Sequence, residues 1–130
     1  MTNKELRQLY WLNKEIERDK ERLRELYAAA TDTSCKITGL PHAPGSSDKT
    51  ALAVEIAYLR EVIEQKIKRC YAEYNKILEY INSIDDSFIR QIMTLRYIHG
   101  YSWRKVAHHM GGGNTSDSVR KACIRYLASH

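Results

Sequence analysis

The feature that most constrains the fold of this chain is a long apolar stripe in its middle third. Apolar residues recur there at steps of three or four positions. They are Leu52, Ile56, Leu59, Ile63, Ile67, Cys70, Tyr74, Ile77 and Ile81. This spacing puts one apolar face on a helix, and it predicts a helix over residues 48–82 whose apolar stripe is about 45 Å long. A helix of that length needs a companion along much of its course.

Residues 3–28 are predicted to form that companion. Leucine or isoleucine recurs every seven positions at 9, 16 and 23, and a second series at 12 and 26 is interrupted by Asp19. Between the two helices, residues 29–47 hold both prolines of the chain and several hydroxyl side chains, so we expect a loop there. The pattern predicts an antiparallel helical hairpin or coiled coil over residues 1–83.

The predicted second helix is longer than the first by about two turns. The excess leaves apolar surface for the C-terminal residues or for another subunit. We therefore expect a homo-oligomer that forms through the N-terminal helices, although an intramolecular hairpin satisfies the same pattern.

Residues 84–130 are predicted to form a three-helix domain, which makes the whole chain an all-α protein. Asp85 or Asp86 begins its first helix, with Ile84 and Ile89 as an apolar staple, and Gly100 ends it. The expected core residues of this helix are Phe88, Ile92, Met93, Leu95 and Ile98. So short a stretch builds only a marginal core by itself, so we expect the end of the long helix to pack against it.

The last two helices are predicted on either side of a glycine-rich turn. Ser102 provides a side-chain N-cap for the first of them, and Gly111–Gly113 end it because glycine enters left-handed conformations freely. Asn114, Thr115 and Ser116 are candidate caps for the final helix. The residues expected to face inward are Trp103, Val106, Ala107 and Met110 in the first helix and Val119, Cys123, Tyr126 and Leu127 in the second. This arrangement is typical of a helix-turn-helix.

Most of the positive charge of the chain lies in this C-terminal part. From residue 85 onward there are seven Lys or Arg against three Asp, which leaves +4 of the formal net charge of +5. A local excess of this kind favours a polyanionic partner through counterion release. A short helix with an apolar back and a cationic front also fits the major groove of DNA.

Position on these helices selects the candidates for contact with double-stranded DNA. They are Arg104, Lys105, Asn114, Thr115, Ser116, Ser118, Arg120, Lys121 and Arg125. The first two would hold phosphates, the next three would lie near the DNA backbone, and the last four would contact the groove and phosphates. The alternative is that exposed Arg and Lys side chains form only a solvated face.

The same residues resemble region 4 of sigma-70-type transcription factors. The matching segments are Leu95–Tyr97, Gly100–Trp103, Val106–Ala107 followed by Gly111, and Ser118–Arg120. More narrowly, residues 37–127 resemble a family of small phage and prophage proteins with a C-terminus like sigma region 4. The hallmarks of that family stand here as Ile37–Pro41, Ser47–Asp48 and Arg96–Trp103. The resemblance implies a regulator of late-gene transcription that acts at promoters with RNA polymerase.

Two departures limit what this resemblance implies. The interval from Gly111 to Val119 is eight residues, which is two more than region 4 normally has, so the crossing of the two helices can differ. No stretch resembles the promoter-melting region of a sigma factor. The resemblance therefore implies promoter or polymerase contact and does not imply a complete sigma factor.

Other chemistry finds little support in the sequence. No run of apolar residues approaches the length of about 20 residues that a membrane helix needs. The N-terminus lacks the apolar core of a signal peptide. Cys35, Cys70 and Cys123 lie far apart, which argues for reduced thiols in a cytoplasm and against a disulfide framework or zinc site. Adjacent histidines, His108 and His109, diverge on a helix and cannot both face one ion.

No catalytic arrangement stands out either. The glycine triplet lacks the Lys-Ser/Thr of a phosphate-binding loop, and the paired aspartates at 85 and 86 are explained by helix capping. We therefore expect a protein that is not an enzyme and needs no cofactor. The expected location is the cytoplasm of a bacterial host, in association with the nucleoid.

The favoured function is sequence-specific binding of double-stranded DNA in transcription control, in a protein of phage origin. Two other functions are consistent with the same pattern. One is recognition of phage DNA for packaging, as in a small terminase subunit, with the coiled coil building a ring. The other is a polymerase-binding adaptor that has little DNA affinity of its own.

Overall fold

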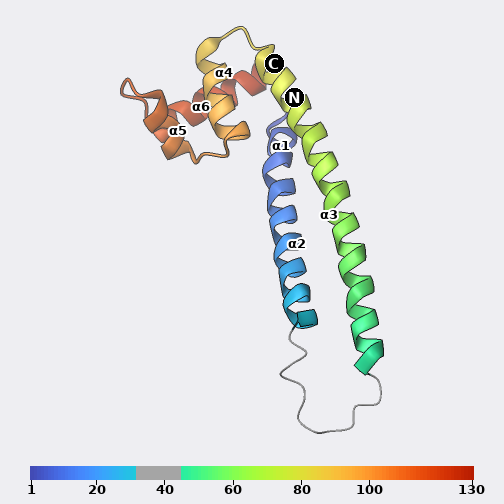
Figure 1. The fold of residues 1–130 in the computed structure, drawn as a ribbon. Helices are drawn as coiled ribbons and strands as arrows, with labels where there is room; N and C mark the ends of the chain where they lie inside the picture. The colour runs from blue at the N-terminus through green and yellow to red at the C-terminus, as the bar shows by residue number, and fades with distance from the viewer. Residues whose placement is uncertain (32–44) are drawn as a thin grey trace. The chain divides into compact units, whose positions relative to one another are not determined.

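Every regular element of the described chain is helical. The computed structural model describes residues 1–31 and 45–130, with side chains from residue 50 onward in the second range (Figure 1). The elements are α1 (Asn3–Leu6), α2 (Gln8–Thr31), α3 (Gly45–Asn82), α4 (Ser87–Met93), a π-helical turn (Thr94–Ile98), α5 (Trp103–Met110) and α6 (Ser116–Ser129). The predicted all-α class, with long N-terminal helices followed by a helical C-terminal part, is confirmed.

The helices extend into both ends of the segment 29–47 that was predicted to be a loop. α2 continues to Thr31 and α3 already begins at Gly45. The remainder of that prediction lies outside the described residues, as do Cys35 and the segment Ile37–Pro41 that carries part of the resemblance.

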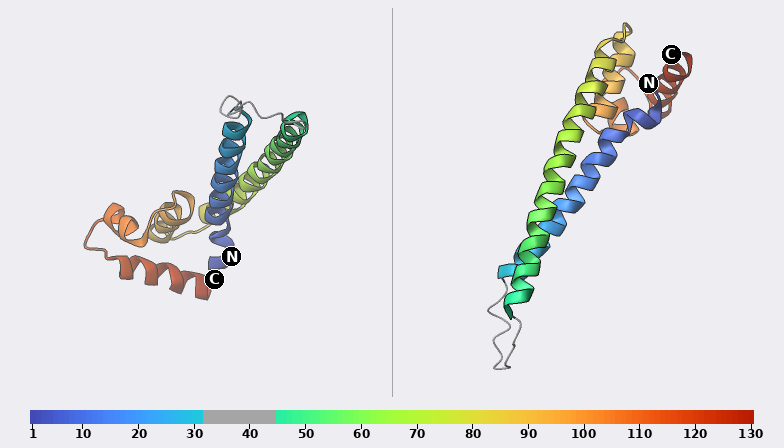
Figure 2. Two further views of the ribbon diagram at one scale, coloured as in Figure 1. Left: turned by 90° about the horizontal axis from the view of Figure 1, so that it is seen from below. Right: turned by 90° about the vertical axis from the view of Figure 1, so that its right-hand side faces the viewer.

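The described chain divides into two compact units, and the first comprises residues 14–69. In this unit α2 and α3 lie side by side (Figure 2). Ion pairs join residue 19 to 66 and residue 22 to 55, and this descending order shows that the two helices are antiparallel. Ile16, Leu26 and Ile63 are buried between them.

A cross-helix ion pair explains the polar interruption in the apolar stripe of α2. Lys66 Nζ lies 2.5 Å from the Asp19 carboxylate and 3.8 Å from that of Glu15. The hydrogen bond that Lys66 donates to Asp19 is the main reason why the pKa of Lys66 is raised. Asp19 therefore replaces an apolar contact with a charged one that favours one register of the hairpin.

The second unit combines residues 1–13 with residues 70–130. Its core joins Leu6 and Leu9 from the N-terminus to Ile77 and Ile81 from the end of α3. The buried residues of the C-terminal helices that complete it are Ile84, Ile89, Ile92, Met93, Tyr97, Val106, Ala107, Val119 and Cys123. The expected packing of the long helix against the last helices is confirmed. The compact units thus differ from the predicted division into residues 1–83 and 84–130.

The N-terminal helix is interrupted, contrary to the prediction of one helix over residues 3–28. α1 ends at Leu6 and α2 begins at Gln8, with Arg7 between them. A capping box caps the start of the short α1. The Thr2 side chain accepts from the Glu5 amide, and the Glu5 carboxylate accepts from the Thr2 amide.

The start of α4 is shifted by one residue from the first of the two predicted caps. Asp86 is the N-cap, and its Oδ1 accepts from the amides of Phe88 at 2.9 Å and Ile89 at 3.3 Å. In this register Ile84 and Ile89 are still buried in the core, but Asp85 is not the cap between them. Phe88, which was predicted to be a core residue, is 39% exposed.

A π-helical turn changes which residues of the following segment face the core. The amide of His99 donates to the carbonyl of Thr94, five residues earlier, at 3.1 Å. Tyr97 is buried as a result, and Leu95 and Ile98 are only half-buried. Gly100 follows with φ +72°, so the predicted glycine end of this helix is confirmed.

The Tyr97 hydroxyl connects the two ends of the second unit. It donates to Asn3 Oδ1 at 2.8 Å and lies 3.8 Å from the Cys123 sulfur. Burial raises the pKa of the Tyr97 hydroxyl and of the Cys123 thiol. Both groups are therefore neutral in the folded protein at neutral pH.

The Asp19–Lys66 pair should contribute a measurable coupling to the stability of the hairpin. We expect Asp19→Asn and Lys66→Met each to lower the free energy of unfolding, with a coupling in the double variant of about 0.5–1 kcal/mol. Urea unfolding of the four proteins measures this coupling. The control is a cycle on Glu21 and Arg24, an exposed pair within α2, where we expect a smaller value. Equal couplings in the two cycles would contradict a role for Asp19 in the register.

Stability should fall at alkaline pH because of Tyr97 and Cys123. The pKa values of both groups are higher in the folded protein than in the unfolded chain. Their contribution to the free energy of unfolding is therefore complete below pH about 9 and decreases as the pH rises. We expect the free energy of unfolding of Cys123→Ala to depend less steeply on pH between 8 and 10.5 than that of the unchanged protein. Urea titrations across this range test the difference, and parallel curves would refute it.

Candidate nucleic-acid interface

The predicted turn between α5 and α6 is built by backbone and side-chain hydrogen bonds. Ser102 caps α5 as predicted, because its Oγ accepts from the Lys105 amide at 3.2 Å. Gly111 ends α5 with φ +65°, and the next two glycines also have positive φ. The side-chain amide of Asn114 donates to the Gly111 carbonyl at 2.7 Å. The amide group of Asn114 is thus part of the turn.

Thr115 is the residue that caps α6, out of the three candidates. Its Oγ1 accepts from the Ser118 amide at 3.1 Å, and the Ser118 Oγ accepts from the Thr115 amide at 2.9 Å. The Ser118 hydroxyl also donates to the Thr115 carbonyl at 2.9 Å. Ser118 was predicted as a groove contact, but its hydroxyl is engaged in this reciprocal cap. Ser116 remains an exposed residue of the first turn.

The inner faces of both helices agree with the prediction. Val106, Ala107, Val119 and Cys123 are buried. Trp103, Met110, Tyr126 and Leu127 are half-buried and pack against the same core. The inner face therefore fixes which residues of α5 and α6 lie on the outside.

The outer face of α6 carries two cations with an apolar residue between them. Lys121 and Arg125 are exposed, and Ile124 is 48% exposed. Asp117 is exposed at the start of the helix, where a carboxylate complements the positive end of the helix dipole. Ile124 was missed by the sequence analysis, although the helical phase set by Val119 and Cys123 places it outside.

Arg120 lies at the side of this face. Its Nη2 is 3.4 Å from Asp117 Oδ1, and its side chain is 43% exposed. Ion pairs of this exposed kind contribute little, so Arg120 can leave Asp117 for another anion.

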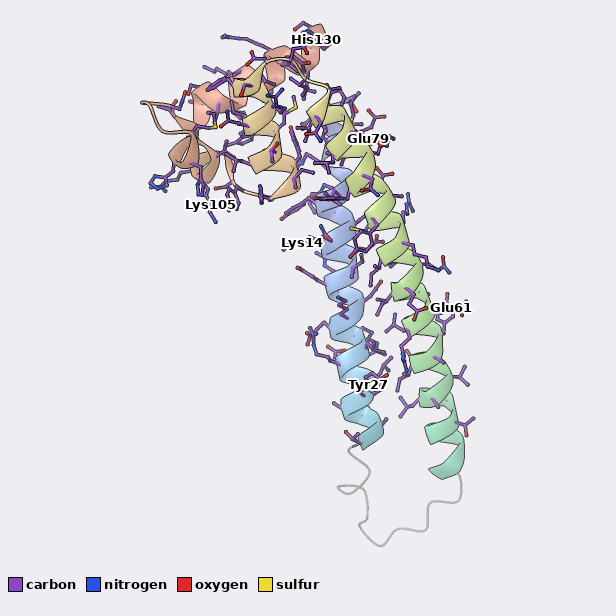
Figure 3. All side chains as sticks on the ribbon, turned by 45° about the horizontal axis from the view of Figure 1, so that its top comes forward. Lys14, Tyr27, Glu61, Glu79, Lys105 and His130 are labelled. Carbon is purple, nitrogen blue, oxygen red and sulfur yellow. The ribbon has the colours of Figure 1, made fainter. Side chains whose placement is uncertain are left out.

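The outer face of α5 adds further positive charge. Arg104, Lys105 and His108 are exposed, and Figure 3 shows Lys105 on the outer side of its helix. Lys105 Nζ lies 4.0 Å from the centroid of the Tyr101 ring, and that ring lies 4.9 Å from the ring of His109. This packing directs the Lys105 side chain along the start of α5.

The candidate cations have few acidic neighbours. Within the described part of the chain, Arg104, Lys105, Lys121 and Arg125 have no carboxylate within ion-pair distance, and Arg120 has only Asp117. We define the outer face of the two helices by Arg104, Lys105, Arg120, Lys121, Ile124 and Arg125. Its positive charge is therefore available to an anionic partner.

The paired histidines do not face a common point. The rings of His108 and His109 are 6.0 Å apart at their centroids and nearly perpendicular. Cys123 is buried against Tyr97. Across residues 1–31 and 50–130, whose side chains are described, His, Cys, Asp and Glu nowhere gather in a group of three that could hold a metal ion.

Comparison with models of protein families, with curated proteins and with solved structures found no match for this chain. Among the described helices, none combines the length and the apolar character that crossing a membrane requires.

The reciprocal cap should stabilise α6, and with it the outer face. We expect Thr115→Ala to lower the free energy of unfolding by about 1 kcal/mol, because an orphan amide at the helix start loses its partner. The matched control is Ser116→Ala, which removes a neighbouring hydroxyl without a cap role and should change stability little. Chemical denaturation compares the two, and equal effects would mean that the cap contributes nothing.

Proposed function

We propose that this protein binds double-stranded DNA as a transcriptional regulator, with α6 in the major groove. The observation that carries the proposal is the outer face defined above, which is cationic, exposed and almost free of carboxylates. It stands on a buried inner face that fixes the direction of its side chains. The width of the major groove, about 12 Å, admits such a helix.

The residues of the outer face suit different parts of a DNA duplex. Lys121 and Arg125 can donate to base edges or phosphates, and Ile124 can contact the methyl group of thymine. Arg104 and Lys105 at the start of α5 are placed to hold phosphates. Asn114 in the turn, Thr115 at the N-cap and Ser116 in the first turn of α6 would approach the sugar-phosphate backbone. Ser118 acts through the cap and not through its own contact.

The resemblance to sigma region 4 supports transcription control, in a protein of phage origin that meets RNA polymerase at promoters. It also supports a location in the bacterial cytoplasm and on the nucleoid. A second copy of the chain is a further proposed partner through the N-terminal helices, where Val54 and Tyr58 are 64% and 68% exposed. We also propose that the protein has no catalytic activity.

Removing two cations from the outer face should weaken DNA binding strongly. The ligand is a duplex selected by the protein from a random pool at 100 mM salt and then sequenced. We expect the double variant Lys121→Ala with Arg125→Ala to bind this duplex at least about tenfold more weakly. The slope of log K against log salt concentration should fall in magnitude by about two, which corresponds to the loss of two phosphate contacts. The control is Lys68→Ala with Arg69→Ala, which removes the same charge from exposed positions of α3.

Different results would support different functions. Equal retardation of the duplex by both double variants, or binding that does not depend on salt, would refute the assignment of the outer face. Copurification with RNA polymerase in the absence of DNA binding would favour the adaptor. Ring-sized assemblies in light scattering would favour a role in DNA packaging.

A further inference from the structure

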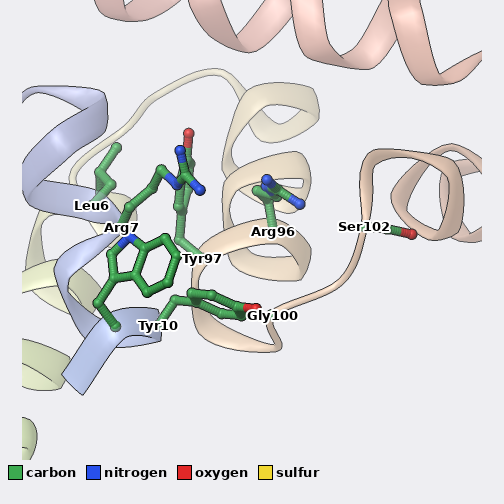
Figure 4. A pocket seen from close by; sticks show the side chains of 8 residues that line it. Leu6, Arg7, Tyr10, Arg96, Tyr97, Gly100 and Ser102 are labelled. Atoms are coloured by element: carbon green, nitrogen blue, oxygen red, sulfur yellow. The ribbon is translucent and has the colours of Figure 1, made fainter. Parts of the chain in front are cut away.

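A pocket of about 260 Å³ opens in the unit formed by residues 1–13 and 70–130. Its wall comes from the α1–α2 junction on one side and from the π-helical turn and the start of α5 on the other (Figure 4). The lining residues are Leu6, Arg7, Tyr10, Trp11, Arg96, Tyr97, Gly100 and Ser102. None of them belongs to the outer face of α5 and α6.

The charge of the pocket is positive and is not neutralised. It is lined by Arg7 and Arg96 but by no Asp or Glu. Within the described chain neither guanidinium has a carboxylate at ion-pair distance. Arg96 is held in place, because its Nη1 donates to the Tyr101 carbonyl at 2.9 Å and its guanidinium lies 4.7 Å from the ring centroid of Trp103. A positioned guanidinium with remaining N–H groups suits an oxyanion, and phosphate above all.

Two aromatic rings line the same pocket and are unusually exposed. Tyr10 is 42% and Trp11 is 51% exposed, and their rings meet edge to face with centroids 5.1 Å apart. The guanidinium of Arg7 lies 5.6 Å from the Trp11 ring centroid. Large aromatic side chains are normally buried, so the exposed part of these rings beside two arginines offers a surface on which a planar ring can stack.

The remaining lining residues leave room for a ligand. Leu6 and Tyr97 are 1% and 6% exposed and form a fixed floor. A Cβ atom built on Gly100 would meet nothing within 4 Å, so the backbone there is open. The pocket volume lies just below the range of about 300–1,000 Å³ that is usual for small-molecule sites. A ligand of the size of one nucleotide matches it.

We propose that this pocket binds a nucleotide. The phosphate would lie between Arg7 and Arg96, and the base would stack against Trp11 and Tyr10. An anionic group and a flat aromatic ring joined in one small molecule satisfy both halves of the lining, whereas either half alone does not. The nucleotide can be free or can be the 5′-phosphorylated end of a single strand, and both present the same chemistry. The site is independent of the proposed duplex-binding face.

Calorimetry with the full chain tests the required chemistry. The probes are adenosine monophosphate, adenosine and inorganic phosphate, followed by a short single-stranded oligonucleotide with and without a 5′-phosphate. We expect adenosine monophosphate to bind at least about tenfold more tightly than adenosine or phosphate alone, because each lacks half of the contacts. Tighter binding of the phosphorylated oligonucleotide than of adenosine monophosphate would identify a strand end as the source.

Two variants locate the site. We expect Trp11→Ala and Arg7→Gln each to weaken binding of adenosine monophosphate about tenfold while the melting temperature changes little. Arg104→Gln is the matched control, since it removes an exposed arginine outside the pocket and should leave nucleotide binding unchanged. In nuclear magnetic resonance spectra the indole signal of Trp11, assigned with Trp11→Phe, should shift as the nucleotide is added.

The outcomes separate this proposal from the proposed function. Arg7→Gln should retain binding of duplex DNA, and Lys121→Ala with Arg125→Ala should retain binding of the nucleotide. No heat with adenosine monophosphate at millimolar concentration, or equal affinities for the protein and both pocket variants, would overturn the nucleotide site. Binding of a peptide rich in Asp, Glu and Trp in place of the nucleotide would also overturn it.

Discussion

The C-terminal helices depend on one contact. Apolar side chains from the start of the chain and from the end of α3 are buried against these helices. Leu6 and Leu9 are inserted from the N-terminus, and Ile77 and Ile81 from the end of α3. A fully buried aliphatic side chain contributes about 1.5–3 kcal/mol, so these four residues matter greatly to so short a domain. The directions of α5 and α6, and thus of their cations, follow from residues far away in the sequence.

Helical periodicity alone predicted most of the fold, but it could not predict which surfaces meet. A spacing of three and four residues identifies an apolar face, whereas the partner of that face depends on the path of the chain. Leu9 was therefore assigned to the hairpin, although it is buried in the core shared with the C-terminal helices. The π-helical turn had a similar effect. Its extra residue per turn brought Tyr97 into the core, where regular spacing had placed Leu95 and Ile98.

The candidate interface was predictable to a similar extent. The phase of α6 followed from Val119 and Cys123, so Lys121 and Arg125 were correctly placed outside. The role of Ser118 was not predictable, because a hydroxyl near a helix start can bond either to the backbone or to a partner, and here the backbone is closer. Ile124 was overlooked because apolar residues were expected inside, and the pocket was overlooked because its two walls are about 90 residues apart in the chain.

The distribution of paired and unpaired charge separates the two parts of the molecule. Over residues 1–84, fourteen Lys or Arg are balanced in number by thirteen Asp or Glu, and ion pairs such as Arg22 with Glu55 and Lys66 with Asp19 join the two helices of the hairpin. The fields of two paired charges of opposite sign largely cancel each other, and salt screens what remains over about 8–10 Å. On α5 and α6 only Arg120 has a described carboxylate within ion-pair distance, and in the pocket Arg7 and Arg96 have none, so the field of these cations extends into solvent. A polyanion would therefore be attracted more strongly to the C-terminal helices than to the hairpin, although the hairpin carries more charged residues.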